Sequence, residues 1–133
     1  MNEGWYGDEY LVLFTQAESD AAAARYSLAR RLPGYVLVGL RFWDDFIVVS
    51  PAGTCLSLST VPLDVARGQE FELPSAALCL RPDTRFNERV RWYVKPLMFG
   101  GEATPENTTW VTHEQHAELV CWWNDKYDSL KAS

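Results

Sequence analysis

The chain has 133 residues, of which 47% are apolar and 23% are charged, and this balance excludes an intrinsically disordered protein. Six Trp, six Tyr and six Phe give a chain of this length enough large side chains for a sizeable core. Twelve basic residues face 18 acidic ones, so the net charge is −6. Nucleic acid and anionic membranes demand a basic surface, so both are excluded as partners, whereas a basic protein partner is favoured.

The expected location is the cytoplasm. The first residues are polar, acidic and aromatic, without the basic start and apolar run of a secretory signal, and no segment is long and apolar enough to span a membrane. The three cysteines, Cys55, Cys79 and Cys121, are widely spaced and form no Cys-x-x-Cys pair. We therefore expect three small buried side chains in a reducing compartment.

The first half of the chain predicts a strand, a helix and a three-stranded meander. Residues 9–14 are β-branched, aromatic and apolar, as in a buried strand. Thr15 or Ser19 is a credible N-cap for a helix over residues 20–32, which ends at Pro-Gly. Strands are then expected over three segments, residues 35–42, 46–49 and 54–60, with a turn or corner at residues 43–45.

The second half is less regular until its last element. Residues 61–82 have three prolines and read as irregular, residues 88–93 fit a strand or a short helix, and residues 95–109 read as a loop. Thr112 and Gln115 then form a capping-box pattern. One apolar stripe of an amphipathic helix follows, comprising His116, Leu119, Val120, Trp123, Tyr127 and Leu130. The expected fold is a single α+β domain: a mainly antiparallel sheet packed by a helix in the N-terminal half and by the C-terminal amphipathic helix.

Few residues have the spacing of a catalytic or metal site. His113 and His116 share a helical face, but no third or fourth metal ligand converges with them in the pattern, and neither a metal nor a cofactor is expected. Asp44 and Asp45 are adjacent, and adjacent residues of an extended chain point to opposite faces, so they are poorly placed as an acid–base pair. A turn role or partner recognition fits them better.

The charge is concentrated at the two ends of the chain. Residues 1–24 and residues 96–133 are strongly acidic, and several Trp and Tyr lie in or beside these segments. Aromatic side chains bordered by carboxylates are typical of a protein interface, although many of these rings are also expected in the core.

Several segments together resemble the SUKH superfamily of bacterial immunity proteins. They are Leu32-Pro33-Gly34-Tyr35, Gly39-Leu40-Arg41-Phe42-Trp43-Asp44-Asp45-Phe46, Pro96-Leu97-Met98-Phe99-Gly100-Gly101, Asn107, Trp110 and the ending from His113 to Tyr127. The resemblance implies a small α+β sheet with peripheral helices that binds and neutralises a cognate toxin from a polymorphic or contact-dependent secretion system. A SUKH domain usually opens with a helix, whereas this chain opens with a predicted strand.

The sequence therefore predicts a non-enzymatic immunity protein that occludes the active site of a toxin, acting as a monomer or weak dimer in interbacterial competition. The candidate contacts with a basic toxin domain are Trp43, Asp44, Asp45, Glu102, Glu106 and Trp110. Two alternatives stay open. One is a small hydrolase that uses His113 or His116, and the other is a regulatory domain with a small-ligand pocket lined by Trp and Tyr.

Overall fold

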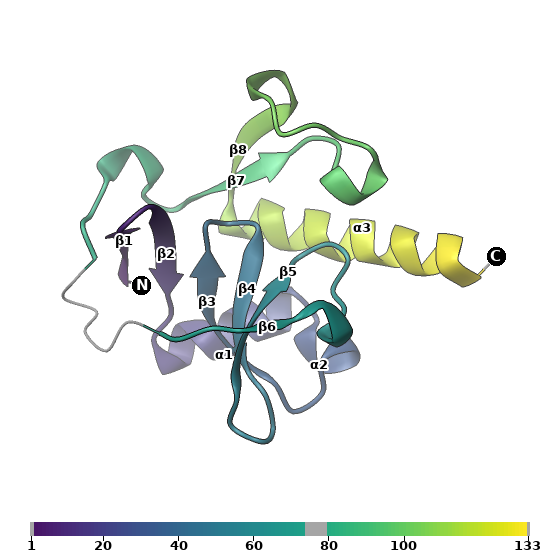
Figure 1. The fold of residues 1–133 in the computed structure, drawn as a ribbon, viewed down its shortest axis with the longest axis horizontal. Helices are drawn as coiled ribbons and strands as arrows, with labels where there is room; N and C mark the ends of the chain where they lie inside the picture. The colour runs from purple at the N-terminus through teal and green to yellow at the C-terminus, as the bar shows by residue number, and fades with distance from the viewer. Residues whose placement is uncertain (1, 74–79, 133) are drawn as a thin grey trace.

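The computed structural model describes residues 2–73 and 80–132. Six antiparallel strands follow one another in chain order across the main sheet: β1 (Asn2–Tyr6), β2 (Glu9–Leu13), β3 (Val36–Arg41), β4 (Asp45–Val49), β5 (Cys55–Ser59) and β6 (Gln69–Glu70). A separate antiparallel hairpin is formed by β7 (Arg89–Tyr93) and β8 (Thr108–Thr112). In Figure 1 this hairpin lies above the long C-terminal helix, and the main sheet lies below it.

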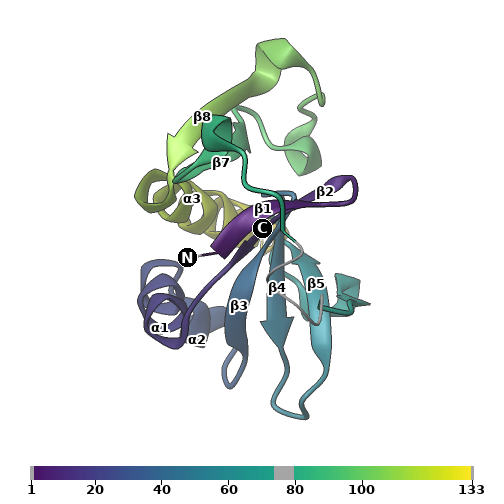
Figure 2. The ribbon, with the colours of Figure 1, turned by 90° about the vertical axis from the view of Figure 1, so that its left-hand side faces the viewer.

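The helices gather on one side of the main sheet. They are α1 (Gln16–Arg25), α2 (Leu28–Arg31) and α3 (His113–Ala132). In Figure 2 α1, α2 and α3 stand together beside β3, and the β7–β8 hairpin lies over α3. Short 3-10 turns complete the connections: η1 (Val65–Arg67), η3 (Thr84–Phe86), η4 (Leu97–Phe99) and η5 (Pro105–Asn107). The predicted α+β domain of a mainly antiparallel sheet and two packed helices is confirmed.

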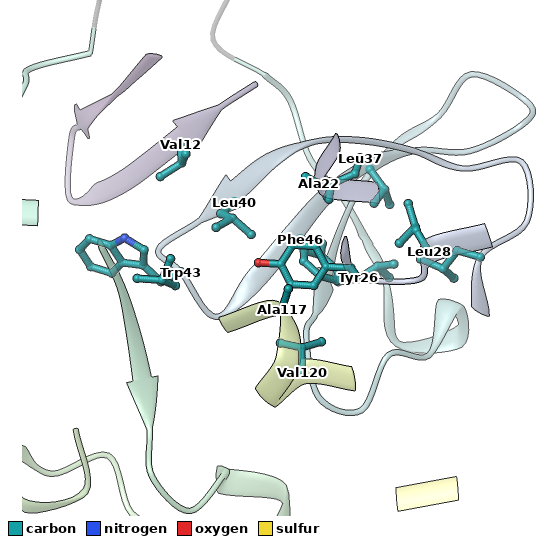
Figure 3. Packing of buried hydrophobic residues seen from close by; sticks show 14 of the residues in the cluster. Val12, Ala22, Tyr26, Leu28, Leu37, Leu40, Trp43, Phe46, Ala117 and Val120 are labelled. Atoms are coloured by element: carbon teal, nitrogen blue, oxygen red, sulfur yellow. The ribbon is translucent and has the colours of Figure 1, made fainter. Parts of the chain in front are cut away.

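The central strands are covered on both faces. On the helical side, Val12, Leu40 and Phe46 pack with Tyr26 and Val120 in the main cluster, which Figure 3 shows between the sheet and α3. On the other side, Leu11 and Ile47 pack with Leu80, and Phe71 and Leu73 lie against them. Both faces of β2 and β4 therefore face protein, which explains their continuous apolar sequences.

The first predicted helix is confirmed in place but differs in its ends. Thr15 is the N-cap and forms the complete capping box with Glu18, so α1 starts at Gln16 rather than at residue 20. Ser19, the other candidate cap, is buried and donates its hydroxyl to the carbonyl of Leu37 at 2.5 Å. The helix also breaks at Ser27, whose φ is 53°. The break allows both Tyr26 and Leu28 to face the core.

Three strands were not predicted. β1 pairs with β2, and the two-residue β6, within the segment read as irregular, pairs with β5. β8 begins in the segment read as a loop and pairs with all five residues of β7. The ambiguous segment at residues 88–93 is a strand. β8 has the sequence Thr-Thr-Trp-Val-Thr, in which β-branched and aromatic residues favour a strand, but five residues beside a long loop give too short a pattern to recognise.

The C-terminal helix begins at the predicted residue, but its last turns lie outside the core. The side chain of Thr112 accepts from the amide of Gln115, and the side chain of Gln115 accepts from the amide of Thr112. His116 and Val120 are about 1% exposed, whereas Leu130, the last residue of the predicted stripe, is 53% exposed. The final turns of α3 project past the sheet in Figure 1, so the end of the stripe lies outside the core cluster.

The cysteines are only partly as predicted. Cys55 and Cys121 are free thiols, and both are half-buried rather than fully buried. Cys79 lies outside the described residues. Among the helices of the described chain, none has both the length and the apolar character that a membrane crossing requires.

The pair formed by Tyr26 and His116 gives a test of this core. The Tyr26 hydroxyl lies 2.5 Å from Nδ1 of His116, and burial lowers the pKa of His116 to about 3. The ring is therefore neutral at pH 7 and its Nδ1 can accept the hydroxyl proton. Replacing Tyr26 by Phe leaves that nitrogen buried without a partner, so the free energy of unfolding should fall by about 1–3 kcal/mol in urea titrations.

The matched control is Tyr35→Phe, because Tyr35 packs against the same core cluster but is only partly buried. Its effect should stay within about 0.5 kcal/mol. Equal effects of the two substitutions would contradict a stabilising role for the Tyr26–His116 contact.

Candidate functional site

The predicted contact residues centre on the turn between β3 and β4. Arg41 pairs with Asp45 across this turn, and Phe42, Trp43 and Asp44 connect them. Phe42 and Trp43 have φ values of 48° and 61°, a left-handed conformation that costs roughly 1–2 kcal/mol per residue in a side chain other than glycine. The amide of Phe42 donates to the carbonyl of Tyr10, and the amide of Thr60 donates to the carbonyl of Asp44, so neighbouring strands hold the turn.

Aromatic packing offsets the strain of this turn. The Trp43 ring stacks on Tyr10 at 4.7 Å between centroids and meets the edges of Phe86 and Trp110 at 5.2 and 5.1 Å. Trp43 is only 2% exposed and Trp110 is 38% exposed. The Trp43 ring is thus a support for the turn, and Trp110 is the ring of this group that a partner can touch.

Arg91 of β7 ties the hairpin to the turn. Its guanidinium lies 4.8 Å from the ring centroids of both Phe42 and Tyr93 and forms an ion pair with Asp44. Cation–π contacts with a partly desolvated Arg are stabilising, and here they fix the guanidinium beside the carboxylate. Within the described chain, Nε of Arg91 and the indole N–H of Trp43 are buried without a hydrogen-bond partner.

The two adjacent aspartates have different surroundings. Burial raises the pKa of Asp44 to about 6, although the neighbouring Arg91 opposes the rise. Burial also raises the pKa of Asp45, whose carboxylate accepts a hydrogen bond from Ser57 at 3.3 Å. Asp45 lies on β4 and its side chain contacts β5, whereas Asp44 faces β7. The pair is split, as the alternation of an extended chain predicts.

A cavity of about 120 Å³ opens beside Asp44. Its walls come from the end of β5, the end of β7 and the start of η4, and the lining residues are Asp44, Ser59, Thr60, Val61, Trp92, Tyr93, Pro96 and Leu97. The volume is well below the roughly 300–1,000 Å³ of pockets that enclose a whole small-molecule ligand. The space is adequate for the end of one side chain.

Asn107 shapes the loop that forms one wall of this cavity. Its side-chain carbonyl accepts from the amide of Lys95 at 2.9 Å, and its amide donates to the carbonyls of Lys95 and Glu102 at 2.9 and 2.8 Å. Gly101 fits inside the resulting loop because a Cβ there would overlap the carbonyl of Lys95. The predicted contacts Glu102 and Glu106 lie on this loop, and both are exposed.

Next to the same loop lies an exposed apolar surface that the sequence did not single out. We call Leu97, Met98, Phe99, Trp122 and Trp123 the loop–helix surface. Trp123 contacts Phe99 at 4.7 Å between centroids and Trp122 at 4.8 Å. Trp122 is 58% exposed, Leu97 49% and Met98 40%. The signal was the Trp-Trp pair, since adjacent residues of a helix point about 100° apart and cannot both share the buried stripe.

Glu118 lies one helical turn before Trp122, and Glu114 lies one turn before that, and both are exposed. Other acids of α3 are neutralised within the chain, because Arg30 and Arg31 of α2 pair with Asp125 and Arg31 also pairs with Asp128. The two acidic ends of the sequence do meet, where α1 contacts α3. The free negative charge on α3 is therefore concentrated in its first half.

The histidines lie elsewhere. His116 is 1% exposed in the core, so a substrate cannot reach its ring. Burial lowers the pKa of His113, whose Nε2 has no hydrogen-bond partner in the described chain, and His113 borders a cleft between α1 and α3. Among the residues that the structure describes, no three His, Cys, Asp or Glu side chains converge on a metal-sized site.

The structure thus brings three of the six predicted contacts together, Trp43, Asp44 and Trp110, and places Glu102 and Glu106 on the adjoining loop. Asp45 lies behind them on β4. No protein-family model, curated protein or solved structure matches this chain.

The environment of Asp44 predicts an unusual titration. Followed by the carbonyl ¹³C chemical shift of its carboxyl group, Asp44 should titrate with a midpoint near pH 6. Asp83 is the internal control, because hydrogen bonds from Arg85 and the Trp5 indole hold its pKa well below the usual range. A midpoint near 4 for Asp44 would contradict the burial that the structure gives it.

The three side-chain hydrogen bonds of Asn107, which we call the Asn107 clamp, predict an effect on stability and on the order of the loop. Asn107→Ala removes three hydrogen bonds, so the free energy of unfolding should fall by about 1–3 kcal/mol and the 95–107 loop should be cleaved faster by protease. Asn87→Ala is the control, since Asn87 is exposed at the end of η3 and should change stability by less than about 0.5 kcal/mol. Equal cleavage rates in the two variants would show that the clamp does not order the loop.

Proposed function

We propose that this protein is a cytoplasmic immunity protein that binds a cognate toxin domain and blocks the toxin's active site. The observation that carries the proposal is the loop–helix surface: Leu97, Met98 and Trp122 are exposed, and the contacts of Trp123 with Phe99 and Trp122 join the two segments. The loop that follows η4 bears the exposed Glu102 and Glu106. Large apolar side chains surrounded by charged ones are the usual composition of a protein-recognition surface.

The segments that resemble SUKH proteins support the same assignment. The β3–β4 turn, the 96–101 segment, Asn107, Trp110 and α3 are far apart in the sequence, yet Trp43 contacts Trp110 and Phe99 contacts Trp123 in space. The remaining segment, residues 32–35, lies at the other end of β3, where Gly34 meets Pro51. Most of the resemblance therefore falls on segments that contact one another, as expected if they carry a shared binding task.

The expected mechanism has two steps. A net charge of −6, with Glu114 and Glu118 beside Trp122, attracts a basic partner over about 8–10 Å at physiological salt and raises its association rate. Burial of the exposed rings and aliphatic side chains then slows dissociation. The bound immunity protein excludes substrate from the toxin by occupying the surface around its active site.

Neither alternative function gains equal support. The cavity that Trp92 and Tyr93 line beside Asp44 is smaller than a metabolite requires, so this cavity does not support a small-ligand regulator. Burial of His116 removes one of the two residues on which the hydrolase alternative depends.

The test is rescue of bacteria that express the toxin domain encoded beside this gene. Co-expression of the intact chain should restore growth, and the purified chain should inhibit the toxin at a one-to-one ratio. Trp122→Ala should weaken binding about 30-fold, as expected for a hot-spot residue worth at least about 2 kcal/mol.

Val36→Ala is the matched control, because Val36 is 44% exposed and lies on the same face of β3 as Val38, which packs on the side of the sheet opposite the helices. It should leave rescue and affinity unchanged. Absence of rescue by the intact chain would reject the immunity function, and equal loss in both variants would reject this surface as the interface.

A further inference from the structure

We propose that the cavity beside Asp44 is a socket for the cationic end of a partner's Arg or Lys side chain, held between the Asp44 carboxylate and the Tyr93 ring. The proposal rests on the immunity function in one respect, because it takes the partner to be the toxin domain. The socket is a property of this chain and is testable without the toxin.

The lining of the cavity has the chemistry that binds an organic cation. Asp44 supplies a carboxylate, and Tyr93, which lies on the same side of β7 as Arg91, supplies an aromatic ring. Trp92 also borders the cavity, but its ring is buried and packs against His116. A carboxylate together with ring faces attracts an ammonium or guanidinium group by ion pairing and cation–π interaction. Val61, Pro96 and Leu97 complete the wall and suit the methylene stem that leads to the charge.

The carboxylate has room for a second cation. Arg91 donates a hydrogen bond to Oδ2 of Asp44. Among the described residues, this is the one hydrogen bond that the Asp44 side chain accepts. The Asp44 side chain is still 40% exposed. A carboxylate offers several lone-pair sites, so the remaining oxygen can accept from an incoming donor.

The local charge favours that cation. Asp44 and Asp45 carry two negative charges against the one positive charge of Arg91, and the neighbouring Arg41 is paired with Glu9. The Arg91 guanidinium is itself held between the rings of Phe42 and Tyr93. The site therefore keeps a negative charge at pH 7 without releasing Arg91.

Exposed apolar side chains lie at the mouth of the cavity. Leu97, a lining residue, is 49% exposed, and Val94, which follows the lining residue Tyr93, is 57% exposed. Leu97 also belongs to the loop–helix surface, so the socket opens at the edge of the proposed interface. Apolar rim residues that exclude water around a charged contact strengthen it.

The test uses Nα-acetyl-arginine methylamide as the probe and the citrulline counterpart, which has nearly the same shape but no charge. Binding is followed by the NMR shifts of the assigned Trp92 indole N–H. We expect saturable binding of the arginine probe in the millimolar range, because a single side chain contributes few atoms, and at least tenfold weaker binding of the citrulline probe. The lysine probe should bind in the same range.

The variants separate the socket from general attraction to an acidic protein. Asp44→Asn should abolish saturable binding, and Asp45→Asn, which removes the adjacent charge on β4, should retain it. Leu97→Trp is a second variant, which narrows the mouth without touching Arg91 and should also abolish binding. Lowering the pH from 7.5 to 5 should weaken binding, because the pKa of Asp44 is about 6 and the carboxyl becomes protonated in this range. Burial also raises the pKa of the adjacent Asp45, so Asp45→Asn serves as the control for its contribution.

Equal binding of the arginine and citrulline probes would overturn the proposal and indicate an apolar pocket. Binding that survives both Asp44→Asn and Leu97→Trp would overturn it as well. If the arginine probe binds as expected but the chain fails to rescue cells from the neighbouring toxin, the socket stands and the toxin assignment falls. If rescue succeeds and the probe does not bind, the toxin docks without the socket.

Discussion

The ion pair between Asp44 and Arg91, enclosed by aromatic rings, is the interaction on which the rest of the site depends. It joins the β3–β4 turn of the main sheet to the β7–β8 hairpin, two parts that share no strand pairing. Arg suits this place because its planar group can stack on Phe42 and Tyr93 while it donates to a carboxylate. A Lys at position 91 would keep the charge and lose the stacking.

The position of the β7–β8 hairpin determines two neighbouring features, the cavity beside Asp44 and the loop–helix surface. The end of β7 and the loop that follows it close the cavity beside Asp44, and the Asn107 clamp carries η4 back over α3. Phe99 then meets Trp123, and Trp122 is left outward. The strained turn, the clamp and the long helix thus act together to present one surface whose apolar side chains have no place in the core.

The sequence predicted the parts of the fold that follow from local pattern. Capping residues located the start of the C-terminal helix and offered Thr15, the N-cap of α1, as one of two candidates. Apolar, β-branched and aromatic runs located β2 to β4, and alternation located β5. It failed where pairing is decided by distant contacts: β8 is a strand because β7 is beside it, and Ser27 breaks a helical sequence so that Tyr26 can reach His116.

The candidate site, like the fold, was predicted only where local sequence decides the outcome. Asp44 and Trp110 were identified from composition and resemblance. The residue that pairs with Asp44, Arg91, lies in residues 88–93, which the sequence left as a strand or a short helix, so the direction of its side chain could not be predicted. Trp43 was expected at the surface and is buried, because the left-handed turn points its ring inward against Tyr10. The direction of a side chain at such a turn depends on backbone angles that the residue type does not reveal.

We propose that this chain recognises a macromolecule through the region around η4, Asp44 and the first half of α3. Hydrogen–deuterium exchange of the chain with and without its cognate toxin domain tests this directly. We expect slower exchange on binding in residues 94–101 and 114–123, with no change in β6 and the 71–73 segment. Protection confined to β6 and that segment, or no protection anywhere at saturating toxin, would contradict it.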